Sequence, residues 1–250
     1  MNGMTVLRYP GGKTRAVNMI QKYLPHTGTI YSPFFGGGAV ELHMASAFGI
    51  KIVACDNFEP LINFWICTQK NPDKVKQYAS EYYPISRERY REAEKTMYNR
   101  SASPYRRASA LFVINRSSYY GRIRGGFSAQ HRFTVSSIDR LTRINLENLS
   151  FSPASDWLRF IKKVPKNGFL FLDPPYFQVG QQLYGTNNSC FDHAKLAAEL
   201  LKRKRWILCY NDDPYIRQLY SGCVVRKVSW AYGCGAKKSS EVLIMPRTMM

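Results

Sequence analysis

The sequence is short of acidic residues and has no hydrophobic stretch long enough to cross a membrane. Its 17 Asp and Glu stand against 36 Lys and Arg, which gives a formal net charge of +19 at pH 7. So large a basic excess favours a polyanionic partner, and nucleic acid is the commonest one for a folded basic protein. No segment is both amphipathic and basic enough to favour a membrane surface. We therefore expect a nucleic-acid partner and no membrane.

Cysteine motifs are missing as well. The six cysteines include no C-x-x-C pair, and several lie in apolar, strand-like runs. This pattern predicts reduced, mostly buried thiols, and neither a disulfide framework nor a zinc site. No other cluster of metal-ligating residues is present, so no metal is expected. The N-terminal residues lack the pattern of a signal peptide, which predicts an intracellular, cytoplasmic protein. The expected nucleic-acid partner further predicts association with DNA.

Strand-like and helical segments alternate at both ends of the 250 residues, and a basic region interrupts them. The alternation predicts an α/β fold. From Pro60 to Phe112 the pattern is helical, with little glycine. We therefore expect one discontinuous domain, residues 1–57 and 145–250, with an inserted domain over residues 58–144.

The sequence Asp-Pro-Pro-Tyr at residues 173–176 directly follows the apolar run 169–172. Such a run predicts a buried parallel strand that ends at the carboxyl edge of a sheet, where α/β proteins bind ligands. The prolines stiffen the loop and leave its carbonyls unclaimed by regular structure. Asp173, the Pro174 carbonyl and the Tyr176 ring could together hold a flat, amino-bearing ring. A proline-stiffened turn with Tyr176 in the core is the alternative interpretation.

Two glycine-containing segments precede this loop. In the first, Pro10-Gly11-Gly12-Lys13 leads into a predicted helix over residues 14–24, and is either a ligand loop or a plain turn. In the second, a predicted strand over residues 29–31 runs into Gly36-Gly37-Gly38 and a helix, which is typical of a nucleotide-type cofactor site. Asp56 ends the next strand at a distance suited to a ribose diol. A tight connection would also explain the glycines.

The middle of the chain concentrates positive charge. Between residues 87 and 143, thirteen Lys and Arg face four Asp and Glu, with Tyr and Phe interleaved. Basic groups pair with phosphates, and aromatic rings can wedge between or stack on bases. A solvated helix face explains part of the charge, particularly over residues 87–95. The glycine-punctuated segment 115–127 is instead predicted to be a loop that probes nucleic acid.

Taken in order, these blocks resemble the Dam-like DNA adenine methyltransferases, the D12 class, alpha group. The resemblance covers nearly the whole length and is most specific at residues 173–176. Looser matches are residues 8–13, 33–38, 210–212, 237–238 and 241–242. It implies an α/β, class I (Rossmann-like) methyltransferase fold with a mostly helical DNA-recognition insert. It also implies transfer of a methyl group from S-adenosylmethionine to the exocyclic N6 amine of adenine in duplex DNA.

The resemblance and the basic loop together assign roles to individual residues. The catalytic residues are expected to be Asp173, Pro174 and Tyr176. Contacts with S-adenosylmethionine are expected from Tyr9, Lys13, Phe34, Gly36, Gly38, Asp56 and Asp173. Contacts with DNA are expected from Arg8, Arg116, Tyr119, Arg122, Arg124, Lys237 and Lys238, with Tyr119 entering the base stack. A companion restriction endonuclease and a monomeric or weakly dimeric state are further expectations.

Two departures from the family pattern affect these expectations. Ser32 stands where the family usually has an acidic residue that helps hold the methionine end of the cofactor. The loop from Tyr120 to Phe133 is shorter than in members specific for GATC, so that target is not implied. Transfer to cytosine N4, RNA or a glutamine side chain would use the same clamp, although Asp173 and the basic insert favour adenine in DNA. A catalytically silent DNA-binding homologue is the alternative of another class.

Overall fold

A seven-stranded sheet organises the computed structural model, which describes residues 5–177, 191–229 and 240–249. The strand order is β3-β2-β1-β4-β5-β7-β6. The first five strands in that order are parallel, and β7 is antiparallel to both of its neighbours. The strands span Thr29–Ser32 (β1), Lys51–Ala54 (β2), Leu149–Phe151 (β3), Phe169–Leu172 (β4), Trp206–Asn211 (β5), Val224–Val228 (β6) and Glu241–Met245 (β7). The predicted α/β fold is confirmed.

The central strand β4 is buried on both faces, as its unbroken apolar sequence predicts. Phe169 and Phe171 point into one core, and Leu170 and Leu172 point into the other. Because β4 pairs with β1, the sheet reverses its direction of growth between these two strands. Open α/β sheets bind ligands in the crevice at such a reversal, beyond the carboxyl ends of the strands.

Helices cover both faces of the sheet. One core is filled from α1 (Val17–Ile20), α2 (Ala39–Phe48) and α3 (Glu59–Lys70), and the other from α8 (Trp157–Lys163), α10 (His193–Leu200) and α11 (Pro214–Leu219). The helix predicted over residues 14–24 is wrong at its start. Its first residues form a turn in which the Ala16 N–H bonds the Lys13 carbonyl, and Leu24 is extended because proline follows it.

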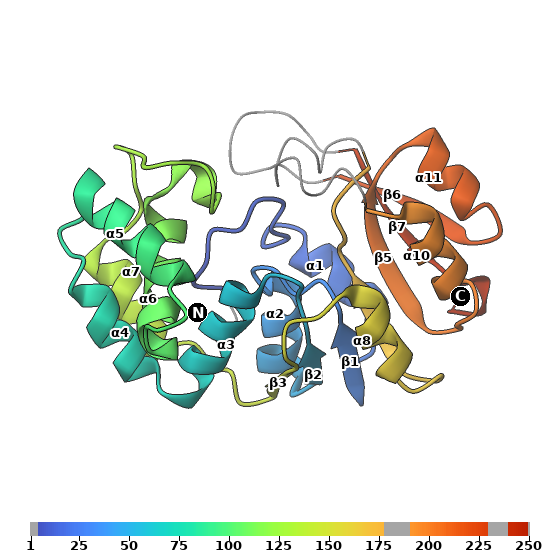
Figure 1. The fold of residues 1–250 in the computed structure, drawn as a ribbon. Helices are drawn as coiled ribbons and strands as arrows, with labels where there is room; N and C mark the ends of the chain where they lie inside the picture. Colours follow the sequence, from blue (N-terminus) through green and yellow to red (C-terminus); the bar gives the residue numbers. More distant parts are fainter. Residues whose placement is uncertain (1–4, 178–190, 230–239, 250) are drawn as a thin grey trace.

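The inserted segment is helical and lies at one end of the molecule, opposite the C-terminal strands and helices (Figure 1). Its elements are α4 (Pro72–Ser80), α5 (Arg87–Tyr98), α6 (Pro104–Ser117), α7 (Val135–Asp139) and the short turns Tyr119–Gly121 and Arg140–Thr142. Serine side chains cap α5 and α6 at their N-termini. The buried helix α6 packs against α3, where Phe112 stacks on Phe64 at 6.1 Å. Helix α3 therefore joins the insert to the sheet.

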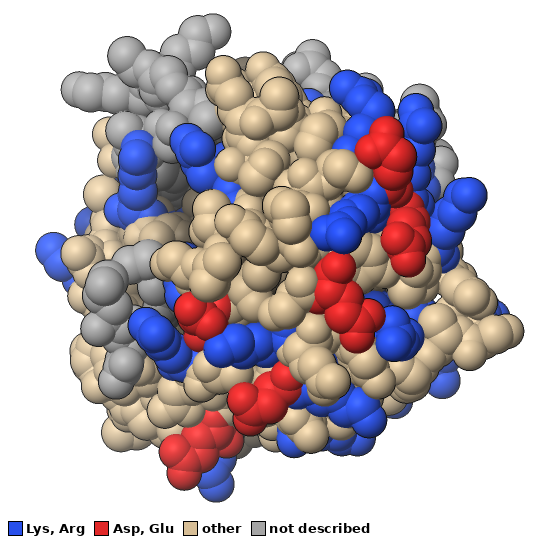
Figure 2. Space-filling model, turned by 90° about the vertical axis from the view of Figure 1, so that its left-hand side faces the viewer, with Lys and Arg blue, Asp and Glu red and all other residues tan. Residues whose placement is uncertain are grey.

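The outer end of the insert carries mixed charge (Figure 2). Arg106 is paired with Glu81 at 2.9 Å, and Lys76 with Asp139 at 2.7 Å. These pairs are partly exposed, so each contributes little to stability. They show that some basic side chains of the insert are paired with its own acidic residues and are less available to a polyanion.

Candidate active site

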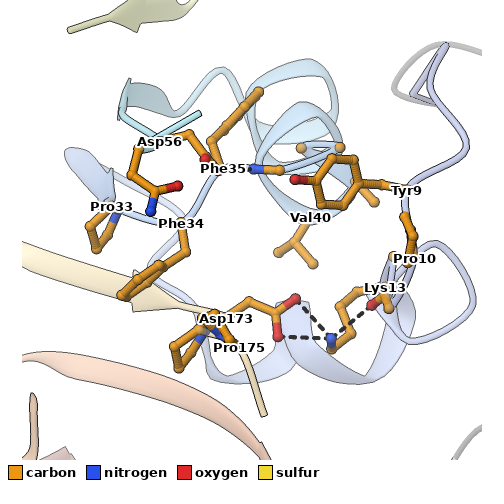
Figure 3. A pocket seen from close by; sticks show the side chains of 18 of the residues that line it. Tyr9, Pro10, Lys13, Pro33, Phe34, Phe35, Val40, Asp56, Asp173 and Pro175 are labelled. Atoms are coloured by element: carbon orange, nitrogen blue, oxygen red, sulfur yellow. Dashed lines mark hydrogen bonds and ion pairs between the residues drawn. The ribbon is translucent and has the colours of Figure 1, made fainter. Parts of the chain in front are cut away.

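Asp173 follows β4 and lies at the floor of a large cavity (Figure 3). Its two carboxylate oxygens accept hydrogen bonds from the Lys13 ammonium at 2.8 and 2.7 Å. Lys13 also donates to the Gly11 carbonyl at 2.9 Å, so the loop before α1 is tied to the end of β4. Lys13 is 3% exposed and the Asp173 side chain is 24% exposed, so this charge-assisted contact is buried on the lysine side and open to the cavity on the carboxylate side.

Burial and the charge of the partner shift the pKa values of Asp173 and Lys13 in opposite directions. Burial raises the pKa of Asp173, and the Lys13 ammonium opposes that rise. For Lys13, burial works against the charged form, but the Asp173 and Glu241 carboxylates outweigh it and raise the pKa. Lys13 therefore stays protonated, and its charge limits the rise in the pKa of Asp173.

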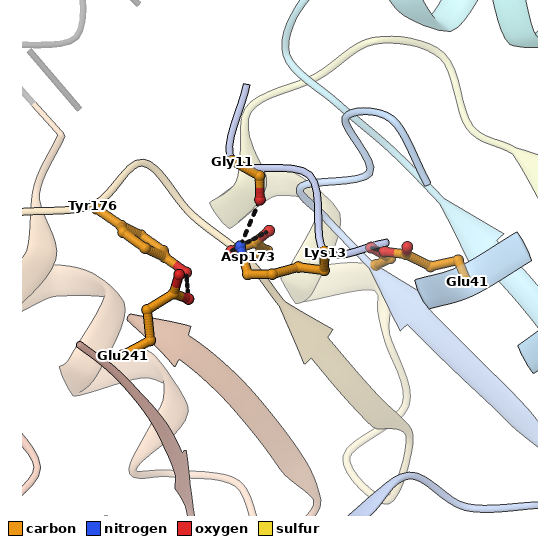
Figure 4. Close-up of polar contacts among 7 residues, drawn as sticks. Gly11, Lys13, Glu41, Asp173, Tyr176 and Glu241 are labelled. Carbon is orange, nitrogen blue, oxygen red and sulfur yellow. Dashed lines mark hydrogen bonds and ion pairs between the residues drawn. The ribbon is translucent and has the colours of Figure 1, made fainter. Parts of the chain in front are cut away.

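Tyr176 presents its ring beside the same ion pair. The Lys13 ammonium lies 4.9 Å from the ring centroid, and the Tyr176 hydroxyl donates a hydrogen bond to the Glu241 carboxylate at the start of β7 (Figure 4). Burial, followed by the negative charges of Asp173 and Glu241, raises the pKa of Tyr176 well above its usual value. The hydroxyl therefore remains neutral and anchors the ring in one orientation.

The glycine turn after β1 faces Asp173 across the cavity. Gly36 and Gly38 have φ angles of 50° and 64°, which favour glycine. A Cβ atom on Gly37 would lie 2.8 Å from the Tyr9 Cβ, so the turn and the N-terminal loop approach too closely for any side chain. The Gly36 N–H donates to Asp56 at 2.9 Å, and the Phe58 N–H donates to the other Asp56 oxygen at 3.1 Å. Asp56 therefore fixes the shape of the turn.

The cavity has a volume of about 1050 Å³. That is slightly above the usual range for small-molecule sites, roughly 300–1,000 Å³. All the predicted catalytic and cofactor residues line it, and Arg8 and Arg122 do so among the predicted DNA contacts. In Figure 3 the Tyr9 ring points in from one side, and Phe34 and Asp56 from the other. Aromatic rings, a bent glycine turn and buried carboxylates suit a ligand with a flat ring and polar ends.

A hairpin from the insert forms one wall of this cavity. Ser118 pairs with Phe127, and the Tyr119 N–H bonds the Gly126 carbonyl at 3.1 Å. The Asn115 amide donates to the Arg8 carbonyl at 2.8 Å and to the Gly121 carbonyl at 2.9 Å, and accepts from the Arg8 N–H at 2.8 Å. One buried amide thus joins the hairpin to the N-terminal loop.

Gly121 is where the hairpin meets that loop, and we expect its replacement to be costly. Its φ is +74°, and an added Cβ would lie 1.9 Å from the Arg8 carbonyl oxygen. Gly126 has a similar φ of +71° but no atom within 4 Å of the added Cβ, so it controls for backbone strain. We predict that Gly121→Ala lowers the free energy of unfolding by about 2 kcal/mol more than Gly126→Ala does. Urea denaturation would measure both, and equal losses would contradict the close contact.

The predicted DNA contacts lie in different environments. Tyr119 is 54% exposed at the hairpin tip, and Arg124 is exposed beside it. The Arg122 Nε is buried without a hydrogen-bond partner among the described residues. Arg116 donates to the Arg132 carbonyl, and burial together with Arg140, Arg8 and Arg132 lowers its pKa to about 10. Lys237 and Lys238 lie outside the described residues.

Three residues that belong to the site were not predicted from sequence: Glu41, Asn115 and Glu241. The available signals were a charge in the first turn after the glycines and a charge opening an apolar strand. Asn115 was placed in the predicted loop over residues 115–127, and that prediction is wrong for residues 115–117, which continue the apolar helix α6. Among the described residues, no three His, Cys, Asp or Glu side chains are placed to hold a metal ion. The four cysteines in the same part of the chain are free thiols. No helix in that part has the length and apolarity needed to cross a membrane.

This strand order, with a glycine turn after β1 and Asp-Pro-Pro-Tyr after β4, defines a Rossmann-like methyltransferase fold. Within that class, the model of the D12 class of N6 adenine-specific DNA methyltransferases matches residues 9–233, and the chain belongs to this family. The fold and the family expected from the sequence are thereby confirmed.

Named relatives are distant in sequence. The chain is 24% identical to the DNA adenine methylase of Vibrio cholerae over 96% of its own length and 94% of the relative. It is 23% identical to the Type II methyltransferase M.CviBI of Paramecium bursaria Chlorella virus NC1A, with 88% and 87% covered. It is 24% identical to the DNA N-6-adenine-methyltransferase of Escherichia phage P1, but spans only 31% of that protein.

Proposed function

We propose that the protein transfers a methyl group from S-adenosylmethionine to the N6 amine of adenine in duplex DNA. The single observation that carries this proposal is the placement of the Asp173 carboxylate in a cavity opposite the glycine turn. When bound, S-adenosylmethionine supplies an electrophilic methyl group. The protein must then make a weakly nucleophilic aromatic amine reactive beside it.

Asp173 and the Pro174 carbonyl would do this by each accepting a hydrogen bond from one N–H group of the amine. These two hydrogen bonds draw the nitrogen out of conjugation with the ring. They also stabilise the positive charge that develops on the nitrogen, so part of their effect appears only in the transition state. Tyr176, anchored by Glu241, would stack on the base. Such a base must leave the duplex to reach the cavity. The Lys13 ammonium already donates to both carboxylate oxygens of Asp173. The amine would therefore either share these oxygens with Lys13 or displace the Lys13 ammonium from them.

The cofactor would be held by Tyr9, Lys13, Phe34, Gly36, Gly38, Asp56 and Asp173. The close approach of the glycine turn to Tyr9 leaves backbone, not side chains, facing that part of the cavity. Both Asp56 oxygens already accept backbone N–H bonds, so a ribose hydroxyl would use their remaining lone pairs. We propose for Asp56 a double role, shaping the turn and receiving the ribose.

DNA would lie against the insert, for which we propose a target-recognition role with boundaries near residues 58 and 144. Tyr119 is exposed on a hairpin beside the cavity, which suits a ring that fills the gap left by a flipped base. The unpartnered Arg122 Nε lies at the cavity wall, where a phosphate or base edge could satisfy it. Arg8 and Arg116 would add positive charge behind the hairpin.

The test is methyl transfer to unmethylated duplex DNA from S-adenosylmethionine carrying a labelled methyl group. After digestion to nucleosides, we expect label in N6-methyladenine, and sequencing of the methylated positions would give the target. Label in N4-methylcytosine, or in RNA offered as a competitor, would assign another amine. Binding of S-adenosylmethionine without transfer to any nucleic acid would favour a silent DNA-binding homologue.

Arg124 provides a separate test of the DNA surface. We predict that Arg124→Ala reduces the slope of log affinity against log salt by about one, because one phosphate contact is lost. Arg106→Ala is the matched control, since Arg106 is paired with Glu81 at the outer end of the insert. Fluorescence anisotropy with labelled duplex DNA at several salt concentrations would measure both slopes. An unchanged slope for Arg124→Ala would remove it from the interface.

A further inference from the structure

Glu41 is a buried carboxylate that no step above uses. It lies in the first turn of α2, is 3% exposed and lines the cavity. Its Oε1 accepts a hydrogen bond of 2.6 Å from the hydroxyl of Ser32 at the end of β1. No ion pair includes Glu41 in the described part of the chain. A buried carboxylate with only a neutral donor is costly, and an arriving cation would offset that cost.

The charges that face Glu41 are already committed to each other. Lys13, from the loop before α1, and Asp173, from the end of β4, form their own ion pair. Figure 4 shows Glu41 reaching toward this pair from α2, on the side away from Glu241. Burial raises the pKa of Glu41 to about 7, although the Ser32 hydrogen bond opposes the rise. Near neutral pH the carboxyl group is thus divided between its protonated and ionised forms.

We propose that the Glu41 carboxylate, oriented by Ser32, receives the α-ammonium at the amino-acid end of the methyl donor. The inference rests on the proposed use of S-adenosylmethionine. An ammonium has three N–H groups that can bond a carboxylate, whereas the sulfonium centre has none. The assignment also accounts for Ser32, because the acidic group expected at that position is supplied from the next helix.

Binding of a cation lowers the pKa of a neighbouring carboxyl, so ligand binding must release protons. Near pH 7 we expect a measurable fraction of a proton to be released per bound S-adenosylmethionine, and the affinity to weaken as the pH falls below 7. Isothermal titration calorimetry in two buffers of different ionisation enthalpy measures this number. S-adenosylhomocysteine keeps the ammonium but lacks the sulfonium, and should release the same amount. 5′-Methylthioadenosine lacks the amino-acid end and should release none.

Substitutions distinguish proton release by Glu41 from proton release by Glu241, whose pKa is similar. Glu41→Gln keeps an acceptor for Ser32 but loses the charge, so we expect its affinity for S-adenosylmethionine to fall at least about tenfold and its proton release to vanish. Its affinity for 5′-methylthioadenosine should not change, which also shows that the variant is folded. Glu241→Gln is the control, because burial also raises the pKa of Glu241 to about 7. This variant should still release protons.

Three results would contradict the proposed role of Glu41, and a fourth would contradict the proposed function. Equal proton release with 5′-methylthioadenosine, or loss of the release in Glu241→Gln in place of Glu41→Gln, would overturn the assignment of Glu41. So would an affinity of Glu41→Gln within twofold of the native protein. Failure of the native protein to bind S-adenosylmethionine would instead refute the proposed function, and the inference with it.

Discussion

Asp173→Ala is expected to reduce methyl transfer by about 10³-fold or more while leaving DNA affinity within a few fold. The proposed reaction needs an acceptor that draws the amine out of conjugation as positive charge develops, and preorganised groups of this kind are worth about two to three orders of magnitude each. Asp173 also holds Lys13, so its removal disturbs the cavity floor a second time. DNA affinity should persist, because the exposed hairpin and the basic insert lie outside this contact.

The measurement is single-turnover methyl transfer at saturating DNA, paired with anisotropy for binding. Asp139→Ala is a suitable control, since it also removes a carboxylate paired with lysine, but on the surface of the insert. The rate of methyl transfer by Asp173→Asn should lie between those of Asp173→Ala and Asp139→Ala, because the asparagine amide oxygen still accepts one hydrogen bond. Turnover of Asp173→Ala within tenfold of the native rate would refute the catalytic assignment.

Lys13→Met and Asp173→Ala should both be strongly destabilising, since each leaves a charged partner of the ion pair uncompensated. Removal of one partner from a fully buried ion pair leaves an uncompensated charge and typically costs about 3–5 kcal/mol; because the Asp173 side chain is 24% exposed, we expect a loss near the lower end of that range, about 3 kcal/mol. Lys202→Met is the control: Lys202 forms a 2.7 Å pair with Glu199 but is 66% exposed, so its loss should cost well under 1 kcal/mol. Urea denaturation at pH 7.5 would give both values.

The loss in free energy of unfolding caused by Lys13→Met should depend on pH in a direction that the ion pair determines. Without Lys13, burial is opposed only by Tyr176, so the pKa of Asp173 rises further above the value in the unfolded chain. An acid with a raised pKa in the folded state destabilises the fold increasingly as the pH rises above its unfolded pKa. The deficit of Lys13→Met should therefore be smaller at pH 5 than at pH 7.5. The double variant with Asp173→Asn should recover most of it, and a deficit that does not vary with pH would contradict the ion-pair explanation.

The sequence predicts the strands well because their apolar runs are short, unbroken and bounded by turn residues, as at residues 169–172. It also predicts that Asp173 and the glycine turn share an edge, since parallel strands end on the same side of a sheet. The Lys13 contact with Asp173 was beyond such reasoning, because 160 positions separate the two residues and no local pattern pairs them. Asn115 was missed for the same reason: its partners lie in the N-terminal loop and in the hairpin.

Asn115 also links the wall of the cavity to the exposed hairpin. Its side-chain amide bonds the backbone of Arg8, next to the cavity-lining Tyr9, and the backbone of Gly121, next to the exposed tyrosines. A ligand that immobilises the N-terminal loop would therefore also immobilise the hairpin. By thermodynamic reciprocity, DNA that orders the hairpin must tighten cofactor binding by the same factor. We expect positive cooperativity between the two substrates, transmitted through a single carboxamide.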